Sequence, residues 1–267
     1  MKGFYDAINN METLMKQHTG RYCLFIIITL FFLPHIVLAQ EGQYQKITAP
    51  EVQGMMKNTN VIIINMLSKI EYELQHIPGS INIPINILGT PGVLPDDTNT
   101  PLIFYCMASL WPYSERAARF AVKQGYKEVF WFQGGINEWR SFNYPLDIQN
   151  CYKDLKPKKI SPDQVTEYLL QADTFLLDVR PQDYSKGPDF IKGAYHCPLL
   201  DLTERIHELP KDKKILINDW KMQQSPLAAK YLMAHNFDVI GVIRGGMTRW
   251  LSEKLPFETR SIKSDTL

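Results

Sequence analysis

Short apolar runs alternate with stretches of helical character along most of the chain. Apolar runs of this length, bounded by polar or turn-forming residues, are typical of buried strands. The pattern predicts strands over Val61–Ile64, Leu102–Tyr105, Glu128–Phe132, Phe175–Leu177, Ile215–Ile217 and Val239–Ile243. It predicts helices over Ser114–Gln124 and Ser225–His235. Strands that alternate with helices form a parallel sheet with helices on both faces, so the predicted fold class is α/β.

The second half of this pattern repeats the first. Thr48 precedes Glu51 by three positions, and Ser161 precedes Gln164 in the same way, as in a capping box that opens a helix. Further features recur in the same order at an offset of 111 to 114 residues: segments 76–80 and 190–194, Pro84 and Pro198, segments 101–105 and 214–218, Gly134-Gly135 and Gly245-Gly246, Trp139 and Trp250, and Pro145 and Pro256. Ordered similarity of this kind predicts a tandem duplication.

The duplication predicts two domains, over residues 45–147 and 159–260. The segment between them, from Asp147 to Lys159, contains Lys156-Pro157-Lys158-Lys159 and predicts a linker. Each domain is long enough to bury a hydrophobic core of its own.

The first 39 residues have a different character. Residues Cys23–Ala39 carry no charge, Arg21 precedes them, and Gln40 and Glu41 follow. A basic flank, a short apolar core and a final small residue predict a cleaved secretory signal peptide over residues 1–39. A retained membrane anchor through residues 23–39 is the alternative, although a run of this length is short for a spanning helix; a buried helix is a third. Either of the first two predicts an exported protein, periplasmic or extracytoplasmic.

Composition and charge exclude several classes of protein. The 267 residues are 45% hydrophobic and 21% charged, which rules out a disordered or low-complexity chain. Residues 1–39 hold three of the 29 basic and two of the 28 acidic residues, so the remainder is formally neutral and predicts no nucleic-acid partner. The six histidines are scattered and predict no metal site. No cofactor is predicted. Four cysteines are too few for a disulfide scaffold.

The candidate chemistry lies in the loop from Cys106 to Ser114. Cys106 ends an apolar strand, and Ser114 opens the helix that follows the loop. Sites in open α/β sheets lie at the carboxyl ends of strands, and the N–H groups at the start of a helix stabilise a thiolate. We therefore expect Cys106 to be a nucleophile, although a small buried hydrophobe is the ordinary role of a free cysteine. The predicted substrate-binding loop comprises Met107, Ala108, Ser109, Leu110, Trp111, Tyr113 and Ser114.

These motifs resemble the rhodanese family in its tandem form. The resemblance rests on His76-Ile77-Pro78-Gly79-Ser80, on Tyr105-Cys106 before a loop and helix, on Gly134-Gly135-Ile136 with Trp139, and on Asp178-Val179-Arg180 in the second copy. It implies two α/β domains, each with a five-stranded parallel sheet. It also implies that Cys106 takes up a sulfane sulfur as a persulfide, held by backbone N–H groups of the loop, and passes it to a thiophilic acceptor.

The first copy departs from the family in its charges. Asn65 and Leu67 stand where the family usually has Asp and Arg, and the loop is about two residues longer than usual. No Lys, Arg or Gly lies between Cys106 and Ser114. Because an anionic donor needs a cationic partner, this loop favours a protein persulfide or a neutral molecule as donor. Trp111 and Tyr113 either wall the pocket or pack against the core.

The second copy has Asp219 where the first has Cys106, so we predict that it is inactive. We expect the Asp219 carboxylate to be solvated at the start of the next helix, with Lys221 solvated as well; a role as acid, base or recognition group is the alternative. Three weaker candidates remain. Cys197 is predicted to be buried, Cys151 to be a surface thiol of the linker, and His76 to be structural.

Three functions from different classes follow. The first is an exported sulfurtransferase that uses Cys106, with an unidentified donor and acceptor. The second is a non-catalytic binding or scaffold module whose loops recognise a partner protein. The third, a Cys-dependent phosphatase on the same fold, needs an Arg six residues after the Cys, where this chain has Pro112 and its Arg116 follows only later.

Overall fold

The computed structural model describes residues 43–58, 60–108, 112–148, 152, 154–181 and 189–260. The predicted leader (residues 1–39), the loop residues Ser109, Leu110 and Trp111, and the linker thiol Cys151 lie outside the described residues. Within the described ranges, no helix is long and apolar enough to cross a membrane.

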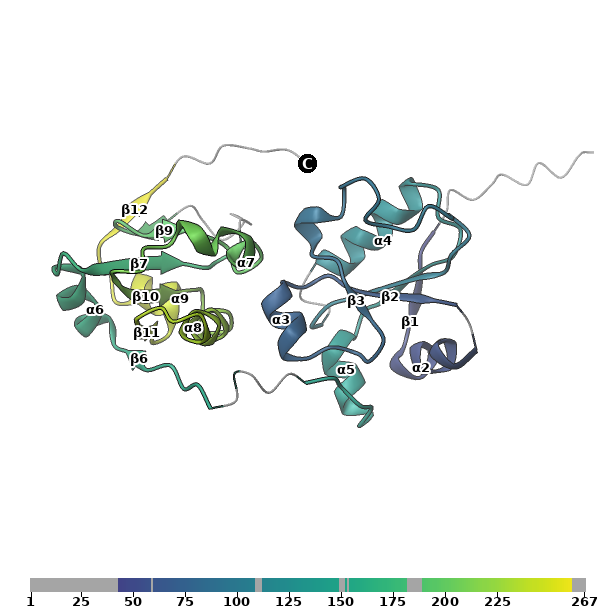
Figure 1. The fold of residues 1–267 in the computed structure, drawn as a ribbon, viewed down its shortest axis with the longest axis horizontal. Helices are drawn as coiled ribbons and strands as arrows, with labels where there is room; N and C mark the ends of the chain where they lie inside the picture. The colour runs from purple at the N-terminus through teal and green to yellow at the C-terminus, as the bar shows by residue number, and fades with distance from the viewer. Residues whose placement is uncertain are drawn as a thin grey trace, which may run out of the picture. The chain divides into compact units, whose positions relative to one another are not determined.

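The first copy of the repeat forms a five-stranded sheet with strand order β1-β5-β4-β2-β3, in which every pairing is parallel. Its strands are β1 (Gln45–Ile47), β2 (Ile62–Asn65), β3 (Ile81–Asn82), β4 (Leu102–Tyr105) and β5 (Val129–Phe132). Its helices are α2 (Ala49–Asn58), α3 (Lys69–Leu74), the 3-10 helix η1 (Ile85–Ile87), α4 (Tyr113–Lys123) and α5 (Gly135–Ser141). Figure 1 shows these elements in purple to teal.

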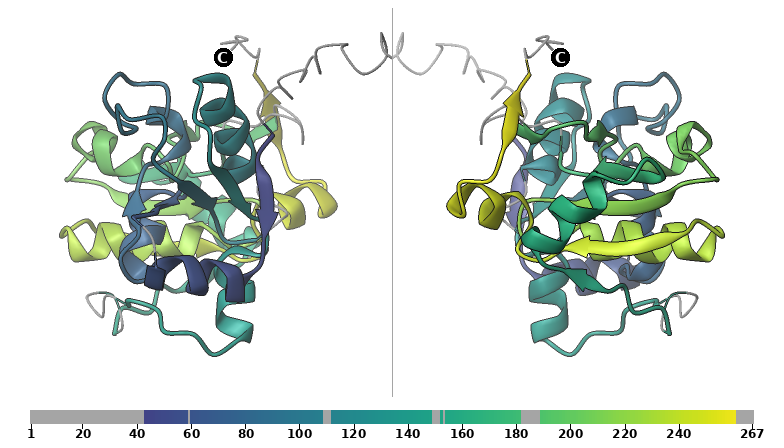
Figure 2. Two further views of the ribbon diagram at one scale, coloured as in Figure 1. Left: turned by 90° about the vertical axis from the view of Figure 1, so that its right-hand side faces the viewer. Right: turned by 90° about the vertical axis from the view of Figure 1, so that its left-hand side faces the viewer.

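Both faces of this sheet are covered, and its central strands β4 and β5 are apolar at every position. Ile103 and Tyr105 of β4 face one core together with residues of α2 and α5, whereas Leu102 and Phe104 face the other core, which α4 closes. The left view of Figure 2 shows α4 on one side of the strands and α2 and α5 on the other. Such burial on both faces is the reason that the parallel strands are continuous apolar runs.

The second copy repeats this arrangement, with strand order β6-β11-β10-β7-β9 and parallel pairing throughout. Its strands are β6 (Lys159–Ile160), β7 (Thr174–Asp178), β9 (Tyr195–His196), β10 (Lys214–Asn218) and β11 (Val239–Ile243). Its helices are α6 (Pro162–Leu169), α7 (Leu202–Arg205), the 3-10 helix η4 (Ile206–Glu208), α8 (Ser225–Ala234) and α9 (Gly246–Ser252). A separate antiparallel pair joins β8 (Asp189–Ile191) to β12 (Phe257–Thr259).

The predicted α/β architecture with two parallel sheets is confirmed. Strands β4 and β11 have the bounds that the apolar pattern predicts; β5 differs from its prediction by one residue at one end, and β2, β7 and β10 differ by one residue at each end. The side chains of Glu51 and Gln164 accept hydrogen bonds from the backbone N–H groups of Thr48 and Ser161, as the capping motif predicts. A further capping box, which was not predicted, is formed by Ser68 and Glu71 at the start of α3.

A glycine in each copy lets a helix approach the site loop closely. Gly135 has a positive φ of 55°, and a Cβ built on it would lie 2.1 Å from the carbonyl oxygen of Cys106. That oxygen instead accepts a hydrogen bond of 3.0 Å from the N–H of Ile136. In the second copy, Gly246 has a φ of 56°, and a Cβ built on it would lie 2.3 Å from the carbonyl oxygen of Asp219. Only glycine fits a left-handed position with this little space, so the Gly-Gly motif holds the loop against the sheet.

Candidate active site

Cys106 directly follows β4, at the carboxyl edge of the first sheet. β4 pairs with β2 on one side and with β5 on the other. Helix α4 then begins at Tyr113 and has Ser114 in its first turn. The Cys106 side chain is 0% exposed. The structure thus brings together the strand end, the helix start and the sulfur, as the loop spacing predicts, but the thiol is buried.

The sulfur of Cys106 has polar neighbours from both ends of the loop. The Ser114 hydroxyl donates a hydrogen bond to Sγ over 3.2 Å, and the thiol donates to the carbonyl oxygen of Ala108 over 3.3 Å. Trp131 of β5 in turn donates its indole N–H to the Ser114 hydroxyl oxygen over 3.0 Å. Trp131 was not predicted as a site residue, because its position in a strand has no sequence signal beyond apolar character.

Burial raises the pKa of the Cys106 thiol above its ordinary value. Hydrogen bonding with the Ser114 side chain and with the backbone of Ala108 and Ser114 opposes this effect, and the negative charge of Glu71 adds to it. The expected stabilisation of a thiolate by the start of α4 is therefore present but is outweighed by desolvation. The neutral thiol is the favoured form at rest.

The described part of the loop is apolar. Met107 packs against the core that contains Cys106, and Tyr113 packs against the core beneath α4. Ser114 is buried, and Ala108 is half-buried. Of the two readings for Tyr113, packing against the core is therefore the one observed.

The second copy holds a carboxylate where the first holds the thiol. Asp219 is 1% exposed, so the expectation of a solvated carboxylate is wrong. Its Oδ1 accepts a hydrogen bond from the N–H of Met222 (2.6 Å), and its Oδ2 accepts from the N–H groups of Gln224 (2.7 Å) and Ser225 (3.0 Å). Met222 has a left-handed φ of 61°, which turns successive N–H groups toward one point. Three converging donors replace the water that a carboxylate normally requires.

Replacing Asp219 by asparagine is expected to lower the free energy of unfolding by about 2–3 kcal/mol. The amide puts an NH2 group where a carboxylate oxygen accepts from the backbone, so at least one buried backbone N–H then faces another donor. Urea unfolding at neutral pH measures this loss. The matched control is Asp212→Asn, in which the side chain is exposed and a change within about 0.5 kcal/mol is expected. Equal stability of the two variants would contradict a held carboxylate.

The two copies also differ in the buried polar residue that ends strand β2 in the first copy and strand β7 in the second. In the second copy, the Arg180 Nε lies 2.9 Å from both carboxylate oxygens of Asp178, and the Asn218 amide donates to Asp178 as well. In the first copy, Asn65 and Leu67 occupy the equivalent positions, and the Asn65 side chain accepts from the N–H of Leu67. The Asn65 side chain thus accepts the same hydrogen bond, from the N–H two positions later, that Asp178 accepts from Arg180. Because the Asn65 amide is uncharged, it needs no cationic partner.

The weaker candidates lie outside this site or are structural. Cys197 is buried in the second domain, as predicted, and burial raises its pKa to about 11. The Nδ1 of His76 contacts the carbonyl oxygen of Tyr72 at 2.8 Å, and the two rings are stacked, which supports a structural role. Arg116 and Lys221 are exposed.

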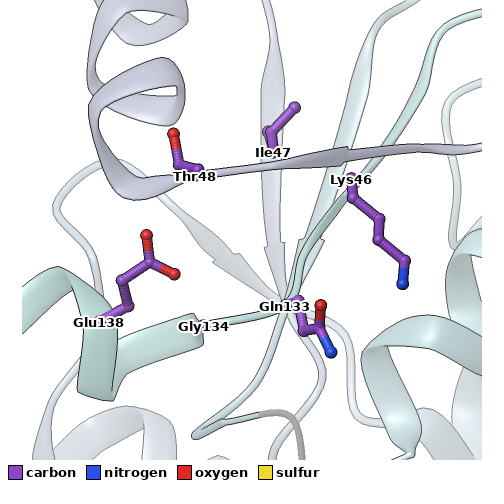
Figure 3. A pocket seen from close by; sticks show the side chains of 6 residues that line it. All are labelled: Lys46, Ile47, Thr48, Gln133, Gly134 and Glu138. Atoms are coloured by element: carbon purple, nitrogen blue, oxygen red, sulfur yellow. The ribbon is translucent and has the colours of Figure 1, made fainter.

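A separate open hollow of about 340 Å³ lies beside β1 and the starts of α2 and α5 (Figure 3). It is lined by Lys46, Ile47, Thr48, Gln133, Gly134 and Glu138. Cys106 does not line this hollow. The carboxylate of Glu138 accepts a hydrogen bond from the N–H of Ala49 at the start of α2, so this polar group of the hollow also stabilises the fold.

Comparisons with known proteins agree with this geometry. The sequence profile of the rhodanese-like domain matches twice, at residues 48–142 and 161–253. A tRNA uridine(34) hydroxylase of Buchnera aphidicola is 27% identical over 138 residues, which are 49% of this chain and 42% of that protein. The thiosulfate sulfurtransferase GlpE of Stutzerimonas stutzeri is 30% identical over 101 residues, which are 38% of this chain and 89% of that protein.

Among solved structures, a thiosulfate sulfurtransferase from Pseudomonas aeruginosa aligns over 83% of this chain and 46% of its own, with 18% identity and a TM-score of 0.41. The chain thus spans less than half the length of the tRNA hydroxylase and of this structure, and nearly all of GlpE. Two profile matches cover most of the described residues, and they include the Cys106 loop, its Asp219 counterpart and both Gly-Gly motifs. This chain belongs to the rhodanese family.

Proposed function

We propose that the protein is a sulfurtransferase that carries a sulfane sulfur on Cys106. The observation that supports this most is the second copy, in which the same strand–loop–helix junction binds an anionic group through three backbone N–H groups. In the first copy the equivalent place has no carboxylate of its own. It holds the Cys106 sulfur, which interacts with the side chain and the backbone of Ser114. A persulfide anion is the kind of group that such a junction stabilises.

The reaction has two displacement steps at sulfur. The Cys106 thiol gives up its proton to water, and its thiolate attacks the sulfane sulfur of the donor. A bond forms between Sγ and that sulfur, the donor's own bond to the sulfur breaks, and the electron pair leaves with the rest of the donor. A thiolate acceptor then attacks the outer sulfur, and the electron pair of the Sγ–S bond returns to Cys106. The steps need no oxidant, metal or cofactor.

The donor that fits is one without a strong need for a cationic partner. The loop residues from Met107 to Tyr113 include no Lys or Arg, whereas small anionic donors are held by such groups. We therefore propose a persulfide on another protein, or a neutral molecule, as donor and a thiol as acceptor. The formal neutrality of the chain after residue 39 gives no basis for a nucleic-acid partner.

The proposed site of action is outside the cytoplasm. The apolar run of residues 23–39 supports export, and the membrane is a partner only if that segment is retained. Fractionation of cells that express the full chain tests this, with the mass of the exported product deciding between a cleaved signal and an anchor.

A binding module without catalysis is the second candidate, and the burial of the thiol favours it. Cys106 is 0% exposed and its pKa is raised, so the thiol at rest is neither accessible nor ionised to a large extent. In this alternative the first-copy loop recognises a partner protein and Cys106 is a packing residue.

Intact mass of the purified protein separates the two candidates. The protein is incubated with thiosulfate, with mercaptopyruvate and with glutathione persulfide, and peptide mapping then locates any adduct. The proposal expects a gain of one sulfur atom on Cys106 that cyanide reverses, with the persulfide as the best donor. No gain from any donor, while the unfolded chain is alkylated at Cys106, would leave the binding module as the better account.

A further inference from the structure

The indole N–H of Trp131 fixes the direction of the Ser114 hydroxyl. An indole N–H only donates, so in its 3.0 Å contact with Trp131 the Ser114 oxygen must be the acceptor. The single proton of that hydroxyl then remains for the sulfur of Cys106, 3.2 Å away. The thiol proton of Cys106 has another acceptor, the carbonyl oxygen of Ala108. The indole and the hydroxyl therefore donate in one direction toward the sulfur, and this chain ends on the sulfur once the thiol proton is lost.

The second copy shows what happens without the indole. Strand pairing places Trp131 opposite Phe104 in the first sheet and Val242 opposite Ile217 in the second, so Val242 occupies the position of Trp131. Ser225 occupies the position of Ser114, and its buried hydroxyl oxygen has no hydrogen-bond partner. The first copy has both the indole and the thiol, and the second copy has neither, whereas the serine is present in both.

We propose that Trp131 is a positioning residue for Cys106, which acts by holding the Ser114 hydroxyl as a hydrogen-bond donor to the sulfur. A donor aimed at Sγ stabilises the thiolate and, after loading, the persulfide anion more than the neutral forms. Trp131 is 4% exposed, so this chain of hydrogen bonds is shielded from competing water. The inference deepens the proposed sulfur transfer, but ionisation of Cys106 tests it without any sulfur donor.

The test compares Trp131→Phe with Trp139→Phe. Each change keeps an aromatic ring and removes one indole N–H from the first domain; in Trp139→Phe the lost partner is the carbonyl oxygen of Pro145 rather than Ser114. The readouts are the pH titration of thiolate absorbance, corrected with Cys106→Ser, and the rate of alkylation at neutral pH. Trp131→Phe is expected to shift the titration to higher pH and to slow alkylation by about three- to tenfold, whereas Trp139→Phe leaves both unchanged.

Ser114→Ala decides whether the effect passes through the hydroxyl. In that background Trp131→Phe is expected to change neither readout further, because the group that it orients is gone. An equal effect of Trp131→Phe with and without Ser114 would overturn the proposal in favour of simple packing, and so would a normal titration in folded Trp131→Phe. Failure of sulfur loading in the unchanged protein, with the titration shift present, would contradict the proposed function and leave this inference standing.

Discussion

Replacing Cys106 by serine is expected to reduce sulfur loading by a factor on the order of 1,000 or more, which is a complete loss in practice. A serine hydroxyl fits the same space and accepts the same hydrogen bond from Ser114, but it does not ionise in the accessible pH range and forms no stable bond to a sulfane sulfur. The measurement is intact mass after incubation with glutathione persulfide. The fold is expected to stay intact, since the change adds no volume to a fully packed site.

Cys197→Ala is the matched control, because it removes the other described thiol, which is also buried. Cys197 belongs to the core of the second domain and not to the cluster that contains Cys106, so loading of this variant is expected to equal that of the unchanged protein even though its stability falls. Full loading of Cys106→Ser would move the sulfur carrier to another cysteine and remove the basis of the proposed mechanism.

Replacing Arg180 by leucine is expected to lower the free energy of unfolding by about 3–5 kcal/mol, because it leaves the buried carboxylate of Asp178 without its cation. Arg180 is 3% exposed and Asp178 is 0% exposed. The guanidinium also donates to the carbonyl oxygen of Asp189 and stacks between the rings of Phe190 and Trp220. Urea unfolding of the purified protein measures the loss.

The double variant Asp178→Asn with Arg180→Leu copies the first repeat, where Asn65 and Leu67 occupy these positions. We expect it to recover most of the loss and to remain within about 2 kcal/mol of the unchanged protein, since no buried charge is left unpaired. The Asn218 amide, whose oxygen has no hydrogen-bond partner, can turn to accept from the new amide. A double variant as unstable as Arg180→Leu alone would show that the arginine acts through packing rather than through its charge.

Most of the fold was predictable from local patterns. The apolar runs at Leu102–Tyr105 and Val239–Ile243 became strands with those bounds, because parallel strands with two covered faces are apolar throughout. The capping motifs at Thr48 and Ser161 were predictable as well, because each joins residues only three positions apart. The position of Cys106 at a strand end before a helix was predictable for the same reason.

The state of Cys106 was not predictable from these patterns. A position at the start of a helix predicts a stabilised thiolate, but the pKa is raised, since burial depends on what the rest of the domain packs over the sulfur. The contact of Ser114 with Trp131 joins residues that are 17 positions apart and that meet only where α4 packs against β5. No periodicity in the sequence marks such a contact.

The duplication, the two α/β domains, the position of the candidate loop and the loss of the thiol from the second copy could all be predicted from the sequence alone. These properties follow from residue identity and short-range periodicity, which the chain carries whatever its tertiary packing. The burial of Asp219 among three N–H groups, and the hydrogen bonds that run from Trp131 through Ser114 to Cys106, became visible only in the folded structure. Those outcomes depend on where folded backbone donors converge and on which side chains exclude water, and both are set by contacts between distant parts of the chain.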